Sequence, residues 1–92
     1  MARFTIRVEL NDATWEHYKR LYSLMSQQGM TDVIPTTKGA AKLPPAEYNF
    51  EGAATKEQVL ESAKAAASKV VRTFSVLVTE SNGRVWHGLS AA

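Results

Sequence analysis

The first residues of the chain alternate between apolar and polar side chains. Apolar residues occupy the even-numbered positions of residues 4–10, and polar residues occupy the odd-numbered positions of residues 3–9. An alternation with period two is typical of a strand that has one face in the core and one in solvent. We therefore expect a half-buried strand over residues 2–10. Asn11 and Asp12 end it, and either is a candidate N-cap for a following helix.

Two later stretches have the spacing of helices. Over residues 13–28, apolar side chains recur every three or four positions and form one stripe, which we expect to be core. The stripe consists of Trp15, Tyr18, Leu21, Tyr22 and Met25. Gly29 tolerates positive φ and suits the helix end. A second, alanine-rich helix is predicted over residues 55–69, beginning with a capping box formed by Thr55 and Gln58.

Further stretches rich in β-branched or alternating residues predict more strands. These stretches are residues 31–36, 46–51 and 73–79. Residues 37–40 are expected to form a hairpin loop, and Pro44 and Pro45 place the start of the third strand after them. The dipeptide Asn82-Gly83 is typical of a two-residue hairpin turn and predicts a fifth strand over residues 84–89.

The predicted order of elements is β-α-β-β-α-β with one extra C-terminal strand. Right-handed crossovers fold this order into a ferredoxin-like plait, an α+β architecture with both helices on one sheet face. The expected strand order is 4-1-3-2, so that the first and third strands are central and antiparallel. We expect a single domain over residues 1–92, whose fifth strand extends the sheet or reaches across a dimer interface.

One register of the first strand against the third pairs apolar side chains with each other on one face and arginines with glutamates on the other. It predicts the pairs Phe4 with Phe50, Ile6 with Tyr48 and Val8 with Ala46 on the helix side, and Arg3 with Glu51, Thr5 with Asn49 and Arg7 with Glu47 on the open side. A slip of one residue would bury two glutamates.

Composition narrows the class of protein. The chain has 92 residues, of which 45% are hydrophobic, and it has no cysteine, which excludes a disulfide scaffold and a Cys-ligated zinc site. It has no run of about 18 apolar residues that would span a membrane. Its 11 basic and 9 acidic residues give a net charge of only +2, with no cationic cluster longer than Lys19-Arg20. We expect a globular, cytoplasmic domain that has no membrane partner, metal ion or small-molecule cofactor.

The open side of the sheet has two interpretations. Arg3 and Arg7 either hold phosphate groups of a nucleic acid or neutralise Glu51 and Glu47, and the register favours the second because it gives each arginine a partner. Trp86 on the predicted fifth strand either marks a partner surface or covers the edge of the core.

Catalytic and metal-binding patterns are weak. His17 and His87 are the histidines of a possible acid–base pair, but nothing in their spacing brings them together. Asp12 ends the first strand, where related plait nucleases place a metal-binding acid, although a helix cap is the simpler role.

Several segments of packing and turn residues carry a family resemblance. They are Phe4–Leu10, Leu21–Met25, Gly29–Thr31, Lys42–Tyr48 and Thr55–Gln58. Together they resemble the GhoS-type family, the endoribonuclease antitoxins of type V toxin–antitoxin systems. The resemblance implies a ferredoxin-like fold and metal-independent cleavage of a toxin messenger RNA. Tyr22 stands where the family's first helix has a basic residue, which leaves open whether this chain cleaves RNA or only binds it.

The resemblance leads to two functional hypotheses. In the first, the protein contacts RNA phosphates through Arg3, Arg7, Lys19 and Arg20. In the second, it is a non-catalytic interaction module that forms a homodimer through its sheet or fifth strand and buries Leu77 and Trp86.

Overall fold

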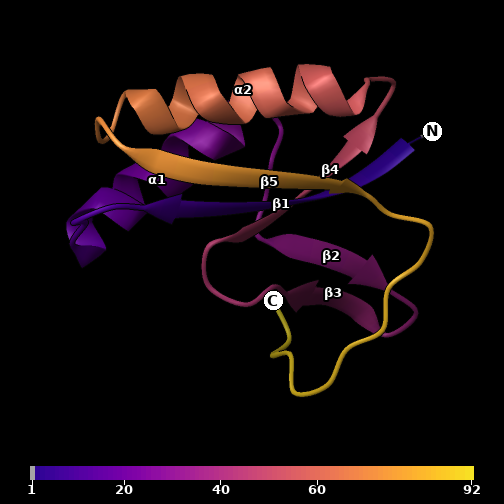
Figure 1. Ribbon diagram of the computed structural model, residues 1–92. Helices are drawn as coiled ribbons and strands as arrows, with labels where there is room; N and C mark the ends of the chain where they lie inside the picture. The colour runs from indigo at the N-terminus through magenta and orange to yellow at the C-terminus, as the bar shows by residue number, and fades with distance from the viewer. Residues whose placement is uncertain (1) are drawn as a thin grey trace.

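The computed structural model describes residues 2–92, which form an α+β protein with two helices and antiparallel sheets (Figure 1). The elements are β1 (Ala2–Leu10), α1 (Trp15–Gln27), β2 (Val33–Thr36), β3 (Gly39–Lys42), β4 (Glu47–Gly52), α2 (Lys56–Ser68) and β5 (Phe74–Glu80). The main sheet has the order β4-β1-β5, and β2 pairs with β3 in a separate hairpin. In Figure 1 this hairpin lies on the side of the main sheet opposite α2.

The predicted register of β1 against β4 is confirmed, whereas the predicted four-strand order 4-1-3-2 is not, because β2 pairs with β3 and leaves β4 at an edge of the main sheet. Strands β1 and β4 are antiparallel, with Phe4 opposite Phe50 and Arg3 opposite Glu51. The ladder ends with Arg7 opposite Glu47, and beyond it the Val8 amide still donates to the Ala46 carbonyl at 3.1 Å. The period of two along β1 therefore decides which side chains enter the core.

Both helices cover one face of the main sheet. The apolar side chains of β1 lie in a single core with Leu21 and Met25 of α1 and with Val59 and Ala63 of α2. Phe4, Ile6 and Val8 have no exposed surface. The small alanines of α2 allow this helix to lie close to the sheet and to α1.

Helix α1 ends as predicted and begins later than predicted. At its end, Gly29 has φ 81°, and the amide of Met30 donates to the carbonyl of Met25 at 3.0 Å, which is a Schellman motif. At its start, the N-cap is Thr14, so neither Asn11 nor Asp12 caps the helix. Asp12 instead has φ 52° and makes the turn after β1.

The apolar stripe of α1 is only partly core. Leu21 and Met25 are fully buried, as expected, but Trp15 is 71% exposed and Tyr22 is 44% exposed, so the prediction was wrong for these two. The apolar side chains span a wider arc of the helix surface than the arc that packs against the sheet and α2. The Lys19 ammonium lies 5.7 Å from the ring centroid of Trp15 and shields one side of it.

The chain between α1 and β4 holds the predicted strand and one strand more, β3, that was not predicted. Thr31 forms an isolated bridge to Asn49 of β4, after which the chain leaves the main sheet and enters the β2–β3 hairpin. Strand β3 begins inside the stretch predicted to be a loop. The hairpin is stabilised by its own small core of Ile34, Ala41 and Leu43, against which Leu89 packs.

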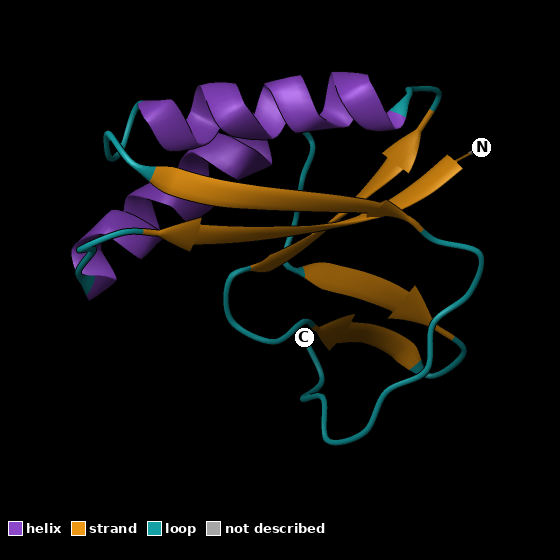
Figure 2. Ribbon diagram, viewed as in Figure 1, coloured by secondary structure: helices purple, strands orange, loops and turns teal. Residues whose placement is uncertain are grey.

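The predicted fifth strand over residues 84–89 is wrong, and so is the hairpin at Asn82-Gly83. Figure 2 shows residues after β5 as a loop that turns away from the main sheet. Its end returns to the hairpin, where Ala91 bridges Ala41. The physical reason is that Arg84 and Leu89 find better partners on the open face and in the hairpin core than β5 offers along its edge.

Candidate functional site

The C-terminal segment, residues 81–92, leaves the main sheet after β5 and reaches back to its open face with the side chain of Arg84. Arg84 anchors it there: its Nε donates to Thr5 Oγ1 at 3.0 Å, and its Nη2 donates to the Phe4 carbonyl at 3.0 Å and to Asn49 Oδ1 at 2.7 Å. Asn49, one of its acceptors, is only 7% exposed. The side chain of Arg84 therefore occupies part of the open face of β1 and β4.

Arg84 is a cation whose three acceptors are all neutral oxygens. Burial lowers the pKa of Arg84, the nearby charge of Arg3 lowers it further, and Glu51 raises it. A guanidinium keeps its proton at neutral pH despite such shifts. Glu51 is also the carboxylate beside Arg3 and accepts from Asn49 Nδ2 at 3.1 Å. Two cations, Arg3 and Arg84, thus lie near one carboxylate, Glu51.

Arg3 and Arg7 lie on the open face with the partners that the register predicts. Arg3 Nε lies 3.8 Å from Glu51 Oε2, and Arg7 Nη1 lies 3.8 Å from Glu47 Oε2. All four side chains are partly solvated, so each pair contributes at most about 1 kcal/mol of stability. The geometry therefore favours neutralisation over a dedicated phosphate clamp.

The four predicted RNA-binding residues do not form one patch. Arg3 and Arg7 lie on the open face of the main sheet, whereas Lys19 and Arg20 belong to α1, which covers the other face. Lys19 contacts the Trp15 ring. A single RNA contact surface would include only one of these two pairs.

The C-terminal segment, β4 and the β2–β3 hairpin enclose an open-face groove of about 340 Å³. Its lining consists of Thr5, Ile34, Leu43, Pro44, Glu47, Arg84, Val85, Trp86, His87 and Leu89. Trp86 is 49% exposed there. The groove combines an aromatic surface, a cation, a carboxylate and an imidazole.

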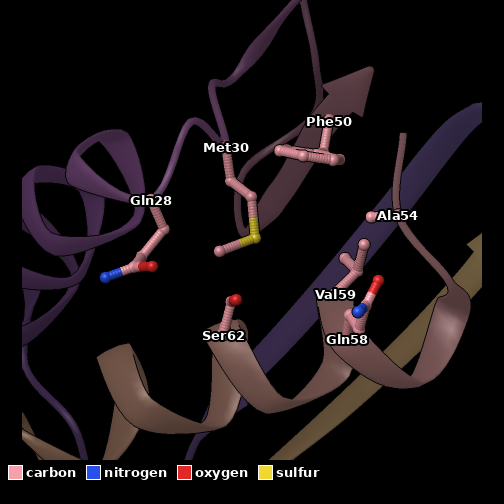
Figure 3. Close-up of a pocket in the computed structure, with 7 residues that line it drawn as sticks. All are labelled: Gln28, Met30, Phe50, Ala54, Gln58, Val59 and Ser62. Atoms are coloured by element: carbon pink, nitrogen blue, oxygen red, sulfur yellow. The ribbon is translucent and has the colours of Figure 1, made fainter. Parts of the chain in front are cut away.

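A smaller cavity of about 100 Å³ lies between the end of α1, β4 and α2 (Figure 3). Its polar side chains are Gln28, Gln58 and Ser62, which are neutral, and Gln58 is already engaged in the capping box with Thr55. Met30, Phe50 and Val59 supply apolar walls. The cavity offers no group for acid–base chemistry or for binding an ion.

The two histidines lie on different sides of the main sheet. His17 lies in the first turn of α1, where its Nδ1 accepts from the Thr14 amide at 2.9 Å. His87 lines the open-face groove. They do not form an acid–base pair. Within residues 2–92 no three His, Cys, Asp or Glu side chains gather in a way that would hold a metal ion, so Asp12 has no such partners.

The two predicted interface residues are both exposed. Leu77 is 64% exposed on the open side of β5, and Trp86 lies in the groove. Strand β5 also forms an edge of the main sheet, because within residues 2–92 it pairs only with β1. Its sequence has no lysine or proline that would discourage pairing with another strand.

Comparison with known proteins adds no family assignment. No protein-family model matches the chain, and neither does any curated protein. Within residues 2–92, no helix combines the length and apolar character needed to cross a membrane.

Arg84 is the residue of this face that the sequence pattern did not single out. The predicted fifth strand contained Arg84 together with Trp86 and supplied no partner for its guanidinium. One feature of the sequence could have indicated its role. The register places the polar residues Thr5 and Asn49 opposite each other on the open side, and buried oxygen atoms at these positions need a hydrogen-bond donor.

Proposed function

We propose that the protein is a ferredoxin-like, GhoS-type protein that binds RNA. The observation that carries the proposal is the charge arrangement around Arg84, whose hydrogen-bond acceptors are all uncharged and which lies near a second cation, Arg3, while Glu51 is the carboxylate that pairs with Arg3. RNA binding rests on cations that contact phosphates. This location is a better candidate than Arg7, whose charge is balanced by Glu47.

The arrangement of elements supports the family part of the proposal. The order β4-β1-β5, with both helices on one face, is compatible with three adjacent strands of the plait. The bridge from Thr31 to Asn49 puts the chain leading into β2 beside β4, on the side where the plait has its second strand. The segments that resemble the GhoS-type family include most of β1 and the first two residues of β4, which are paired in the sheet.

Two matched glutamates provide a test of the charge argument. Glu51 lies beside Arg3 on the open face, and Glu61 pairs with Lys64 at 3.1 Å on α2. Glu51→Gln and Glu61→Gln change the net charge equally. We expect only Glu51→Gln to strengthen binding of a fluorescein-labelled RNA of mixed sequence, measured by anisotropy, because it leaves Arg3 and Arg84 without a carboxylate.

Salt dependence tests the phosphate contacts directly. Contacts to two phosphates predict a slope of about −1.4 in a plot of log K against log salt, or roughly sevenfold weaker binding at 200 than at 50 mM. An affinity that does not fall with salt would contradict the proposal. The same samples, incubated with a chelator and run on a gel, show whether the RNA is also cut without a metal.

A homodimeric interaction module is the second candidate, and the uncovered edge of β5 favours it. The bonds from Ser81 to Arg3 and from Asn11 to Thr73 put odd-numbered residues of β5 in hydrogen-bonded pairs with β1. The amides of Val76 and Val78 therefore point away from β1 and are able to pair with a second copy.

Light scattering during size-exclusion chromatography tests the dimer. Leu77→Lys places a charge on the exposed side of β5 and should convert a dimer to a monomer, whereas Thr36→Lys on the hairpin should not. A mass of one chain for the wild type and for Trp86→Ala would count against this candidate.

A further inference from the structure

We propose that the open-face groove binds one nucleotide of single-stranded RNA, with its base stacked on Trp86 and its phosphate beside Arg84. This inference rests on the proposed RNA-binding function and specifies its site. The binding site is then the open-face groove, and not a set of separate cations on the surface.

The size and lining of the groove suit a nucleotide. Its volume of about 340 Å³ falls within the range of about 300–1,000 Å³ for small-molecule sites. Leu43, Pro44 and Leu89 give it apolar walls, as base stacking requires. Thr5 and Glu47 provide oxygen atoms that accept hydrogen bonds from the amino or imino groups of a base.

Trp86 is the residue in the groove that selects for an unpaired base. It is a large apolar side chain, yet about half of it stays exposed within a concave surface. An aromatic ring in such a place offers a face on which a base can stack, and every base has a matching π-face. Bases in a duplex are already stacked on their neighbours, so this contact favours single strands.

Arg84 supplies a positive charge, which favours binding of a nucleotide phosphate over an apolar peptide. Its Nε and Nη2 hold the sheet, while the hydrogen bonds found among residues 2–92 leave Nη1 unused. The Nη1 atom has two N–H donors for a phosphate oxygen. His87 in the same lining adds a further polar group, so the lining matches an anion with an attached aromatic ring better than a purely apolar partner.

The experiment uses the fact that the chain has two tryptophans. In Trp15→Phe, Trp86 is the sole source of tryptophan emission. Titration with a single-stranded oligouridine should quench that emission and reach a plateau, because stacking brings the base into contact with the indole. A duplex RNA of equal length should quench it far less.

Affinity measurements on matched variants complete the test. Trp86→Ala should weaken oligouridine binding about tenfold or more, because loss of one stacked base has an effect of this order. Trp86→Phe should retain most of the affinity, and Trp15→Ala on the other side of the sheet should be neutral. Circular dichroism of each variant establishes that it is folded.

The outcomes separate the groove from the general function. If RNA binds and responds to Glu51→Gln, but Trp86→Ala has no effect, the groove proposal is overturned and the proposed function stands. If the wild type binds no RNA, both are overturned. Equal quenching by the duplex, or quenching by an apolar peptide with no response to oligouridine, also overturns the assignment to single-stranded RNA.

Discussion

The substitution Arg84→Met should detach the C-terminal segment from the open face without unfolding the main sheet. Methionine keeps much of the length of the side chain and removes three hydrogen bonds, of 3.0, 3.0 and 2.7 Å. Each such bond has a net value of about 0.5–1.5 kcal/mol. Because the guanidinium is partly solvated, the lower part of the summed range applies, and we expect docking to weaken by about 2 kcal/mol.

Hydrogen exchange followed by NMR measures this loss at single amides. The Lys42 amide donates to the Ser90 carbonyl at 2.8 Å, and the Ala92 amide donates to the Ala40 carbonyl at 3.0 Å. Both bonds exist only while the segment is docked. Their exchange should become about 30-fold faster in Arg84→Met, because about 1.4 kcal/mol corresponds to a factor of ten.

Two internal controls make the result decisive. The Met30 amide, which bonds within the Schellman motif, reports on the main core and should change little. Arg72→Met removes the same charge at an exposed position before β5 and should leave Lys42 and Ala92 unchanged. Unchanged exchange at Lys42 and Ala92 in Arg84→Met would refute the role of Arg84 as the anchor.

The core, the helix cap and one buried tyrosine give three further predictions. Ile6→Ala empties a fully buried site on the central strand and should lower the free energy of unfolding by about 2–5 kcal/mol in a urea titration; a loss below 1 kcal/mol would contradict its place in the core. Thr55→Ala removes the acceptor of the Gln58 amide, at 3.1 Å, and should cost about 1 kcal/mol, whereas Ser68→Ala at the other end should cost less. Burial, with a smaller effect of Asp32, raises the pKa of Tyr48 to about 12. Folding therefore favours the neutral form of Tyr48. Its contribution to the free energy of unfolding is fully present below about pH 10 and falls by roughly 2–3 kcal/mol as the pH rises to 12. Tyr48→Phe should lack this loss, and equal pH slopes for the two proteins would exclude it.

The pairing of β1 with β4 and two helix ends were predictable from the pattern of residues along the chain. The alternation over residues 2–10 specified which side of β1 is buried, and charge complementarity with Glu47 and Glu51 then left one sensible register with β4. Gly29 and the Thr55 capping box marked helix ends for equally local reasons. These features depend on neighbours in the chain or on strict pairing rules, so a pattern of residues is enough to predict them.

The position of the C-terminal segment depends on contacts between distant parts of the chain. Asn82-Gly83 has a local preference for a hairpin turn, but a side chain of Arg84 bonded to three groups on β1 and β4 and a Leu89 packed on the hairpin outweigh it. Local preferences amount to about 1 kcal/mol, whereas such distant contacts add up to several. The anchored arginine and the groove beside it exist only because residues about 80 positions apart meet, and no spacing along the chain encodes that meeting.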